Sequence, residues 1–261
     1  MNLSLEGKTA VVCGSTQGIG LATAEELAAL GATCIMVARN KSALEDARGR
    51  LSASSHQKHS YAVADFTHTE EIRKVIHDIV EQQSVHILIN NTGGPKGGPI
   101  TEAKEEEFIN GFNQHLIGNH ILTTSVVPSM KKEGYGRIIN IISTSVRIPL
   151  KNLGVSNTIR GAVASWAKTM SNELAEFNIT VNNILPGFTA TQRLKSLIHA
   201  NAQKAKVDES MVEQQMVAEI PAGRFGTAHE VAAVAAFLAT PAAAYVNGVS
   251  IPVDGGRTGT I

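Results

Sequence analysis

Three glycines lie on a short loop near the amino terminus, between an apolar run and an amphipathic stretch. Gly14, Gly18 and Gly20 follow the run Thr9–Cys13 and open the helical pattern Gly18–Leu30. Glycine permits a tight turn and lets backbone N–H groups approach a pyrophosphate, which the positive end of the following helix attracts. A plain surface turn is the alternative, but the position between a first strand and a helix favours dinucleotide binding.

The next apolar run, Thr33–Val37, ends in residues that bear on the choice of dinucleotide. A site for NAD usually carries a carboxylate here, which holds the 2′-hydroxyl of the adenosine ribose. Ala38 occupies that place and Arg39 follows it, and a guanidinium suits a 2′-phosphate through a bidentate contact. A solvated surface arginine is the alternative. The two residues together favour NADP(H).

The elements that position these residues alternate along the whole chain. Short apolar runs separated by helical patterns predict an α/β fold of the Rossmann type. We expect one domain over residues 1–261, with a doubly wound parallel sheet of about seven strands, helices on both faces and the ligand at the carboxyl ends of the strands. The expected strands are Thr9–Cys13, Thr33–Val37, Tyr61–Ala64, His86–Ile89, Arg137–Ile142, Thr180–Ile184 and Val249–Val253. The expected helices are Gly18–Leu30, Lys41–Ser52, Thr69–Gln82, Lys104–Lys132, Gly154–Phe177 and His229–Ala239.

One segment, Thr189–Pro221, interrupts this alternation with a long and mostly polar stretch. An insertion at the carboxyl end of a strand is well placed to cover a ligand, so we expect a mobile lid. Its cations Arg193, Lys195, Lys204 and Lys206 could meet an anionic substrate or a phosphopantetheine arm. A solvated helical face is the other explanation of these charges.

Composition excludes several classes of protein. Lys+Arg and Asp+Glu both number 23, so no basic excess favours nucleic acid as a partner. Cys13 and Cys34 lie in apolar runs, which predicts two buried free thiols and a reducing compartment. No signal peptide and no run of about 18 apolar residues is present, so we expect a cytoplasmic protein with no membrane partner. No metal site is predicted.

These motifs together make the chain resemble the short-chain dehydrogenase/reductase family over nearly its whole length, and within it the bacterial 3-oxoacyl-acyl-carrier-protein reductases. The matching segments are Gly14-x3-Gly18-x-Gly20, Asp65, Asn90-Asn91-Thr92-Gly93, Pro186–Thr191, Pro221–Gly226 and Val253–Gly256. The resemblance implies contacts of Asp65 with adenine and of the Pro186–Thr191 segment with nicotinamide. The inferred cofactor-binding set is Gly14, Ser15, Thr16, Gly18, Ile19, Gly20, Arg39, Asn40, Asp65, Phe66, Asn91, Thr92, Gly93, Arg160, Pro186, Gly187, Thr189 and Thr191.

The resemblance also marks four candidate catalytic positions. In the family these hold an asparagine, a serine, a tyrosine and a lysine. Ser143 falls on the serine, whereas Ser156 stands at the tyrosine, Arg160 at the lysine and His115 at the asparagine. A subset of the family has a similar pattern, with Thr-Gly-Gly-Pro after the double asparagine and Ser-Asn-x-x-Arg in the helix. This chain is identified as a member by Thr92–Pro95 and Ser156–Arg160.

The substituted residues keep only part of the family's chemistry. Arg160 can donate hydrogen bonds to a ribose and supply positive charge, but it cannot serve as an acid. The hydroxyl of Ser156 is far less acidic than a phenol. His115 is the nearby residue type that titrates near neutrality, and the alternative is a histidine hydrogen-bonded within helix packing.

Two functions from different classes follow. The first is an NADP(H)-dependent reductase of a small-molecule or acyl-thioester carbonyl, with 3-oxoacyl groups among the candidates. The second is a cofactor-binding protein with little catalysis, acting as a sensor or as a partner subunit. The resemblance also implies a homo-oligomer, a tetramer or a dimer, built on the helices Lys104–Lys132 and Gly154–Phe177.

Overall fold

The computed structural model describes residues 1–54 and 56–260 and is built on one seven-stranded sheet. The strands lie in the order β3-β2-β1-β4-β5-β6-β7, and every neighbouring pair is parallel. The predicted doubly wound sheet is therefore confirmed. The strand bounds are β1 Thr9–Cys13, β2 Thr33–Ala38, β3 Ser60–Val63, β4 Ile87–Asn90, β5 Gly136–Ile141, β6 Ile179–Pro186 and β7 Ser250–Val253.

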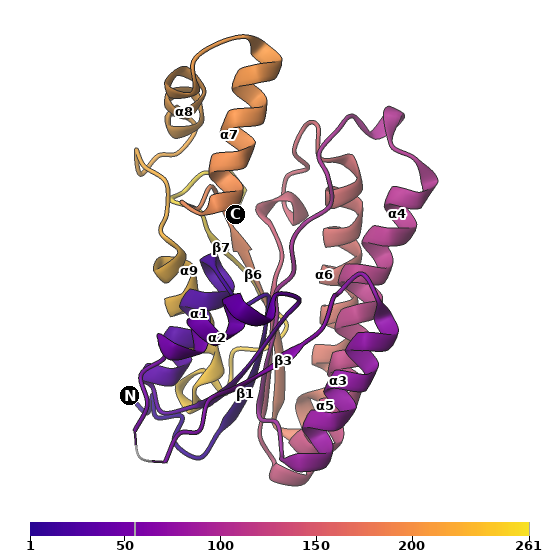
Figure 1. Cartoon of the computed structure of the whole chain (residues 1–261), viewed down its shortest axis with the longest axis vertical. Helices are drawn as coiled ribbons and strands as arrows, with labels where there is room; N and C mark the ends of the chain where they lie inside the picture. Colours follow the sequence, from indigo (N-terminus) through magenta and orange to yellow (C-terminus); the bar gives the residue numbers. More distant parts are fainter. Residues whose placement is uncertain (55, 261) are drawn as a thin grey trace.

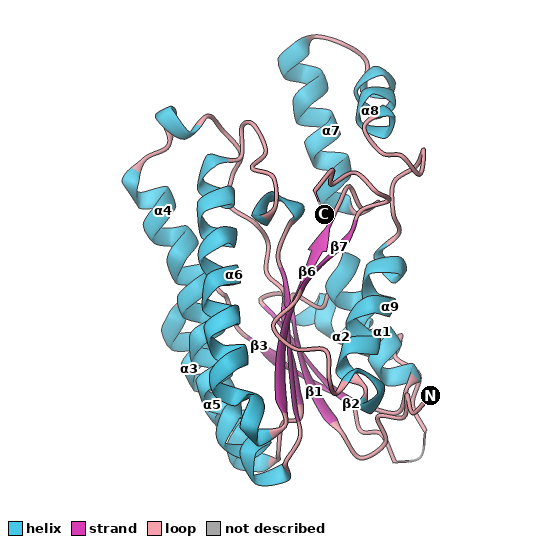
Figure 2. Ribbon diagram, turned by 180° about the vertical axis from the view of Figure 1, so that it is seen from behind, coloured by secondary structure: helices cyan, strands magenta, loops and turns pink. Residues whose placement is uncertain are grey.

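Helices cover both faces of this sheet (Figures 1 and 2). The helices α1, α2 and α9 pack on one face, and α3, α4, α5 and α6 lie on the other. The helix bounds are α1 Gly18–Ala29, α2 Lys41–Gly49, α3 Thr69–Gln82, α4 Glu105–Gly111, α5 Gly118–Glu133, α6 Gly154–Leu174, α7 Gln192–Ala205, α8 Glu209–Ala218 and α9 Ala228–Ala239.

The apolar runs form two cores because side chains alternate across the sheet. In β1, Val12 belongs to the core under α1 and α9, whereas Val11 and Cys13 belong to the core under α3 and α5. Cys13 and Cys34 are buried and free, as predicted. In the described part of the chain, no helix is long and apolar enough to cross a membrane.

The helix expected over Lys104–Lys132 is not continuous, and this expectation was wrong in detail. A π-helical segment, Phe112–Ile117, separates α4 from α5. A π segment accommodates an extra residue and turns side chains out of α-helical register, and such segments frequently mark functional sites. Here it places His115 fully inside the protein, at 0% exposure.

The polar insertion Thr189–Pro221 folds into α7 and α8, which stand above the carboxyl edge of the sheet (Figure 1). The two helices share a small core of their own, made by Leu194, Ile198, Ala202, Val212 and Met216. The segment is thus a compact helical pair rather than an extended loop.

A row of buried amides crosses the carboxyl half of the sheet. Asn90 Nδ2 donates to Asn140 Oδ1 and Asn140 Nδ2 donates to Asn183 Oδ1, both at 2.9 Å. Asn183 Nδ2 then donates to Ser250 Oγ at 3.1 Å. The row joins β4, β5, β6 and β7 through side chains as well as through the backbone.

Removing the central amide should destabilise the fold. Asn140→Ala leaves a donor of Asn90 and an acceptor of Asn183 without partners in the interior, which should lower the free energy of unfolding by about 2–5 kcal/mol. Urea unfolding measures this. Thr180→Val is the matched control, because Thr180 Oγ1 is buried on β6 with no partner among the described residues. That variant should stay within about 1 kcal/mol of wild type. A small loss in Asn140→Ala would contradict a structural role for the row.

Candidate active site

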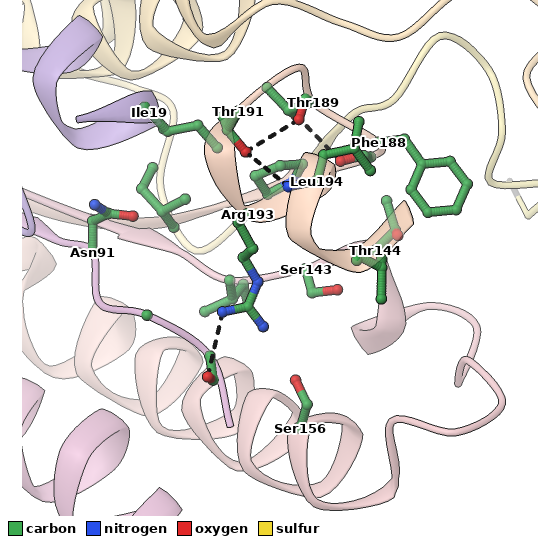
Figure 3. A pocket seen from close by; sticks show the side chains of 18 of the residues that line it. Ile19, Asn91, Ser143, Thr144, Ser156, Phe188, Thr189, Thr191, Arg193 and Leu194 are labelled. Atoms are coloured by element: carbon green, nitrogen blue, oxygen red, sulfur yellow. Dashed lines mark hydrogen bonds between the residues drawn. The ribbon is translucent and has the colours of Figure 1, made fainter. Parts of the chain in front are cut away.

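A cavity of about 340 Å³ opens at the carboxyl edge of the sheet, between the glycine loop, the ends of β4, β5 and β6, and the starts of α6 and α7 (Figure 3). It lies where a doubly wound sheet is expected to bind its ligand. The cavity brings together thirteen of the predicted site residues: Gly14, Gly18, Ile19, Asn91, Thr92, Gly93, Ser143, Ser156, Arg160, Pro186, Gly187, Thr189 and Thr191.

The glycine loop has the geometry that the sequence predicts. Gly14 and Gly18 adopt φ values of +59° and +57°, in the left-handed region that favours glycine. A Cβ on Gly20 would collide with the carbonyl oxygen of Gly14. The helix α1 that follows has no side-chain N-cap, so its first N–H groups are free to meet an anion.

Two further loop residues lie outside the cavity wall. Ser15 is fully buried, and its Oγ finds no hydrogen-bond partner among the described residues. Thr16 is half-buried. Neither side chain contributes to the surface of the cavity.

The residues predicted for the adenosine end lie at the ends of β2 and β3. The Arg39 side chain is 78% exposed and its Nη1 lies 4.0 Å from Asp65 Oδ2. The hydrogen bonds that Thr67 donates hold the pKa of Asp65 below its ordinary value. Asn40 is the N-cap of α2, and its Oδ1 accepts from Ala43 N at 3.1 Å. Phe66 is buried in the core, so its side chain has a structural role.

Ser143 follows the end of β5 and lines the cavity. Its Oγ accepts a hydrogen bond from the backbone N–H of Ser145 at 3.1 Å. An oxygen that accepts from the backbone keeps its own proton free to donate elsewhere. The hydroxyl is therefore suited to donate to an oxygen atom of a bound ligand.

Ser156 and Arg160 lie one helical turn apart on α6 and both line the cavity. Arg160 is 7% exposed, and its Nη1 donates to the carbonyl oxygen of Ile141 at 3.2 Å. Burial and the charge of Arg193 lower the pKa of Arg160 to about 10, so the guanidinium remains charged at neutral pH.

His115 lies beneath the cavity and does not line it. Its Nδ1 is 2.6 Å from Thr92 Oγ1, and its Nε2 has no partner among the residues that the structure describes. Burial, followed by the charges of Arg160 and Arg193, lowers the pKa of His115 to about 2. The ring is neutral at physiological pH, which favours the alternative of a histidine held within helix packing.

The segment after β6 supplies the remaining wall. Thr191 is the N-cap of α7 and accepts from Leu194 N, and its Cγ2 would lie 3.3 Å from a Cβ on Gly18 (Figure 3). This contact places the start of α7 beside the glycine loop.

Arg193, which the sequence marked only as a cation of the lid, also lines the cavity. Its place in the first turn of a helix beside the predicted nicotinamide segment was the signal that could have identified it.

Replacing His115 should change how stability depends on pH. The folded pKa is about 2 and the ordinary value is 6.5, so between these values the unfolded chain binds a proton that the folded chain does not. The free energy of unfolding therefore falls as the pH drops below 6.5, by up to about 1.4 kcal/mol per pH unit. We expect His115→Asn to lose this part of the slope when urea unfolding is measured at about pH 7 and about pH 5.

Thr92→Val provides the comparison for this experiment. It removes the hydrogen bond to His115 but leaves the ring buried, and burial is the main cause of the lowered pKa. Its stability should keep the wild-type dependence on pH. Equal slopes for wild type and His115→Asn would show that the ring is not held neutral by burial.

The chain is similar to known proteins over almost its full length. The model of a family described as enoyl-(acyl carrier protein) reductase matches residues 14–258. The 3-oxoacyl-[acyl-carrier-protein] reductase FabG of Vibrio cholerae is 34% identical over 257 residues, which cover 97% of this chain and 98% of the relative. The NADPH-dependent reductase BacG of Bacillus subtilis is 31% identical over 256 residues, covering 97% and 99%.

Solved structures agree with the fold. The crystal structure of L-sorbose reductase from Gluconobacter frateurii, complexed with NADPH and L-sorbose, superposes with a TM-score of 0.94 at 30% identity and covers 100% of both chains. The seven-stranded parallel sheet, the glycine loop after β1 and the family match over residues 14–258 lead to one conclusion. The chain belongs to the short-chain dehydrogenase/reductase family.

Proposed function

We propose that the protein is an NADPH-dependent reductase of carbonyl compounds, with Ser156 and Arg160 in place of the family's tyrosine and lysine. One observation carries the proposal: the glycine loop and the oriented hydroxyl of Ser143 meet in the same cavity. Relatives described as NADPH-dependent reductases and as 3-oxoacyl-acyl-carrier-protein reductases support the reaction class.

The residues present fit NADP(H). The uncapped start of α1 suits its pyrophosphate, and Arg39 without a neighbouring carboxylate at position 38 suits a 2′-phosphate. Asp65 lies next to Arg39, at the adenosine end. The strand-end segment Pro186–Thr191 would hold the nicotinamide side. When bound, the cofactor supplies the hydride.

The protein's own contribution is to stabilise charge on the substrate oxygen. Ser143 donates a hydrogen bond to that oxygen, and Ser156 offers a second hydroxyl from α6. Arg160 adds a positive charge fixed by its bond to the carbonyl of Ile141. Preorganised donors and charges of this kind account for a large part of catalysis in such sites.

The proton comes from water in this proposal. No tyrosine lines the cavity: the hydroxyl of Tyr61 donates to Glu45, that of Tyr135 donates to the carbonyl of Ala239, and Tyr245 is exposed. His115 is neutral and lies behind Thr92, so it lacks the acidic proton of an imidazolium. A water molecule can donate the proton that a phenol would transfer, and the hydroxide that remains is released to the solvent.

Two further expectations accompany this function. The helical pair α7–α8 covers the cavity as a lid, because α7 begins at the cavity wall and shares its core with α8 rather than with the sheet. We also propose that the chain forms a homo-oligomer through the helices of the α4–α5 and α6 layer.

Wild-type protein should oxidise NADPH in the presence of some members of a panel of ketones, aldehydes and 3-oxoacyl thioesters. Ser143→Ala removes a donor to the substrate oxygen, which should lower kcat/KM by about 10²–10³-fold while the dissociation constant of NADPH stays unchanged. Tight NADPH binding without turnover of any panel member would instead support a sensor or partner subunit.

Ser156→Tyr, which places a phenol one turn from Arg160, should raise turnover.

Arg39 should set the cofactor preference. Losing a charge-assisted contact with the 2′-phosphate should weaken NADPH binding to Arg39→Ala by about 1.5 kcal/mol, roughly tenfold, because the side chain is solvent-exposed. NADH lacks this phosphate, so its affinity should not change. Fluorescence titration of both cofactors measures the effect, and Arg48→Ala, on the neighbouring helix α2, is the control. Equal affinities of wild type for NADPH and NADH would refute the assignment.

A further inference from the structure

Arg193, which the proposed chemistry does not use, reaches into the cavity from the first turn of α7. Figure 3 shows its side chain pointing into the space that Ser143 and Ser156 also line. Its Nη1 donates to the carbonyl oxygen of Gly94 at 3.3 Å. A Cβ on Gly94 would lie 2.6 Å from Arg193 Nη2, so the glycine leaves room for the guanidinium.

A second arginine, Arg160 on α6, lines the same cavity. Arg160 is almost fully buried, and within the described residues its only hydrogen bond is the one from Nη1 to Ile141. Its other N–H groups are left for a ligand. The charge of Arg193 contributes to lowering the pKa of Arg160, which places the two guanidinium groups within electrostatic reach of each other.

No carboxylate balances these two charges. In the described part of the chain, neither arginine forms an ion pair, and no Asp or Glu lines the cavity. Arg257, which also lines the cavity, differs in this respect, because its Nε donates to Glu219 Oε2 at 3.0 Å. Arg160 is withdrawn from water without a partner, which is costly, and a bound anion would remove this cost. Arg193 is exposed and adds a second unpaired positive charge to the same cavity.

The position of the pair indicates which anion it serves. The pyrophosphate and the 2′-phosphate of the cofactor are expected at the start of α1 and at Arg39, on the β1–β2 side. The two arginines lie instead with Ser143 and Ser156, where the substrate carbonyl is expected. Apolar side chains also line the cavity, among them Leu150, Leu153, Phe188, Leu194 and Leu197.

We propose that Arg193 and Arg160 bind a carboxylate of the substrate, and that the substrate is a small oxo acid whose carboxylate lies near its reacting carbonyl. This inference rests on the proposed function and narrows its substrate class, since a neutral acyl thioester would leave both charges unbalanced. Guanidinium groups suit a carboxylate because their paired N–H groups match its two oxygens.

Matched acids and esters test the proposal without turnover. Isothermal titration calorimetry of the NADP⁺-loaded protein should give a dissociation constant for acetoacetate about tenfold or more below that for methyl acetoacetate. Arg193→Gln should abolish this preference. Arg193→Lys should restore part of it. Lys195→Gln removes an equal charge from an exposed position on α7 that does not line the cavity, so this control should keep the preference.

Three results would overturn the proposal. The first is equal binding of acid and ester by wild type, and the second is a preference that survives in Arg193→Gln. The third is weaker NADP⁺ binding by Arg193→Gln, which would assign Arg193 to a cofactor phosphate. Acetonylphosphonate tests the other anion class, and binding much tighter than that of acetoacetate would replace the carboxylate with a phosphate group.

Failure of the proposed function is distinguishable from these results. It would appear as no NADPH oxidation with any carbonyl compound, whereas the preference for acid over ester is a binding measurement and would persist. Should NADP⁺ itself fail to bind, the same titrations on the cofactor-free protein still report on the two arginines. Circular dichroism confirms that each variant is folded.

Discussion

The contact between the glycine loop and Asn91 fixes the geometry on which the rest of the site depends. Asn91 Nδ2 donates to the carbonyl oxygens of Cys13 and Gly14, both at 3.2 Å, and Gly14 N donates to Val37 O at 2.8 Å. A Cβ on Gly14 would collide with the Asn91 backbone, so the approach is possible only for glycine. These hydrogen bonds connect the ends of β1, β2 and β4. The helix α1 begins next to this contact, and its first N–H groups lie beside the cavity.

The other half of the site depends on register. The pairings Asn90 with Asn140, Asn140 with Asn183 and Asn183 with Ser250 are backbone partners as well as side-chain partners. A slip of one residue would turn an asparagine to the other face and break the row. The row therefore keeps the ends of β4, β5 and β6 level, and Asn91, Ser143 and Gly187 follow these ends. These buried amides therefore also determine where the cavity wall lies.

Local sequence pattern accounts for what could be predicted. Strands that are apolar at most positions and a glycine loop before a helix are recognisable from local sequence alone, so all seven strands and the position of Ser143 could be located from sequence. Non-local contacts account for the rest. The π segment depends on burying His115 among distant side chains, and Arg193 enters the cavity only because α7 begins beside the glycine loop. Asn40 caps a helix and Phe66 fills a core, roles that proximity to a motif does not reveal.

The charge of Arg193 helps to explain why position 160 holds an arginine rather than a lysine. Burial and the neighbouring charge take the pKa of Arg160 from 12.5 down to about 10, and it stays cationic. A lysine starts about two units lower, near 10.4, so the same surroundings would bring its pKa closer to the physiological range. A guanidinium therefore stays charged beside Arg193 over a wider range of pH than a lysine would, whereas the buried His115 ring is neutral. The cavity therefore keeps a fixed positive charge across the physiological pH range. In the function that we propose, this charge, rather than a titrating acid, is what the protein offers to an anionic substrate.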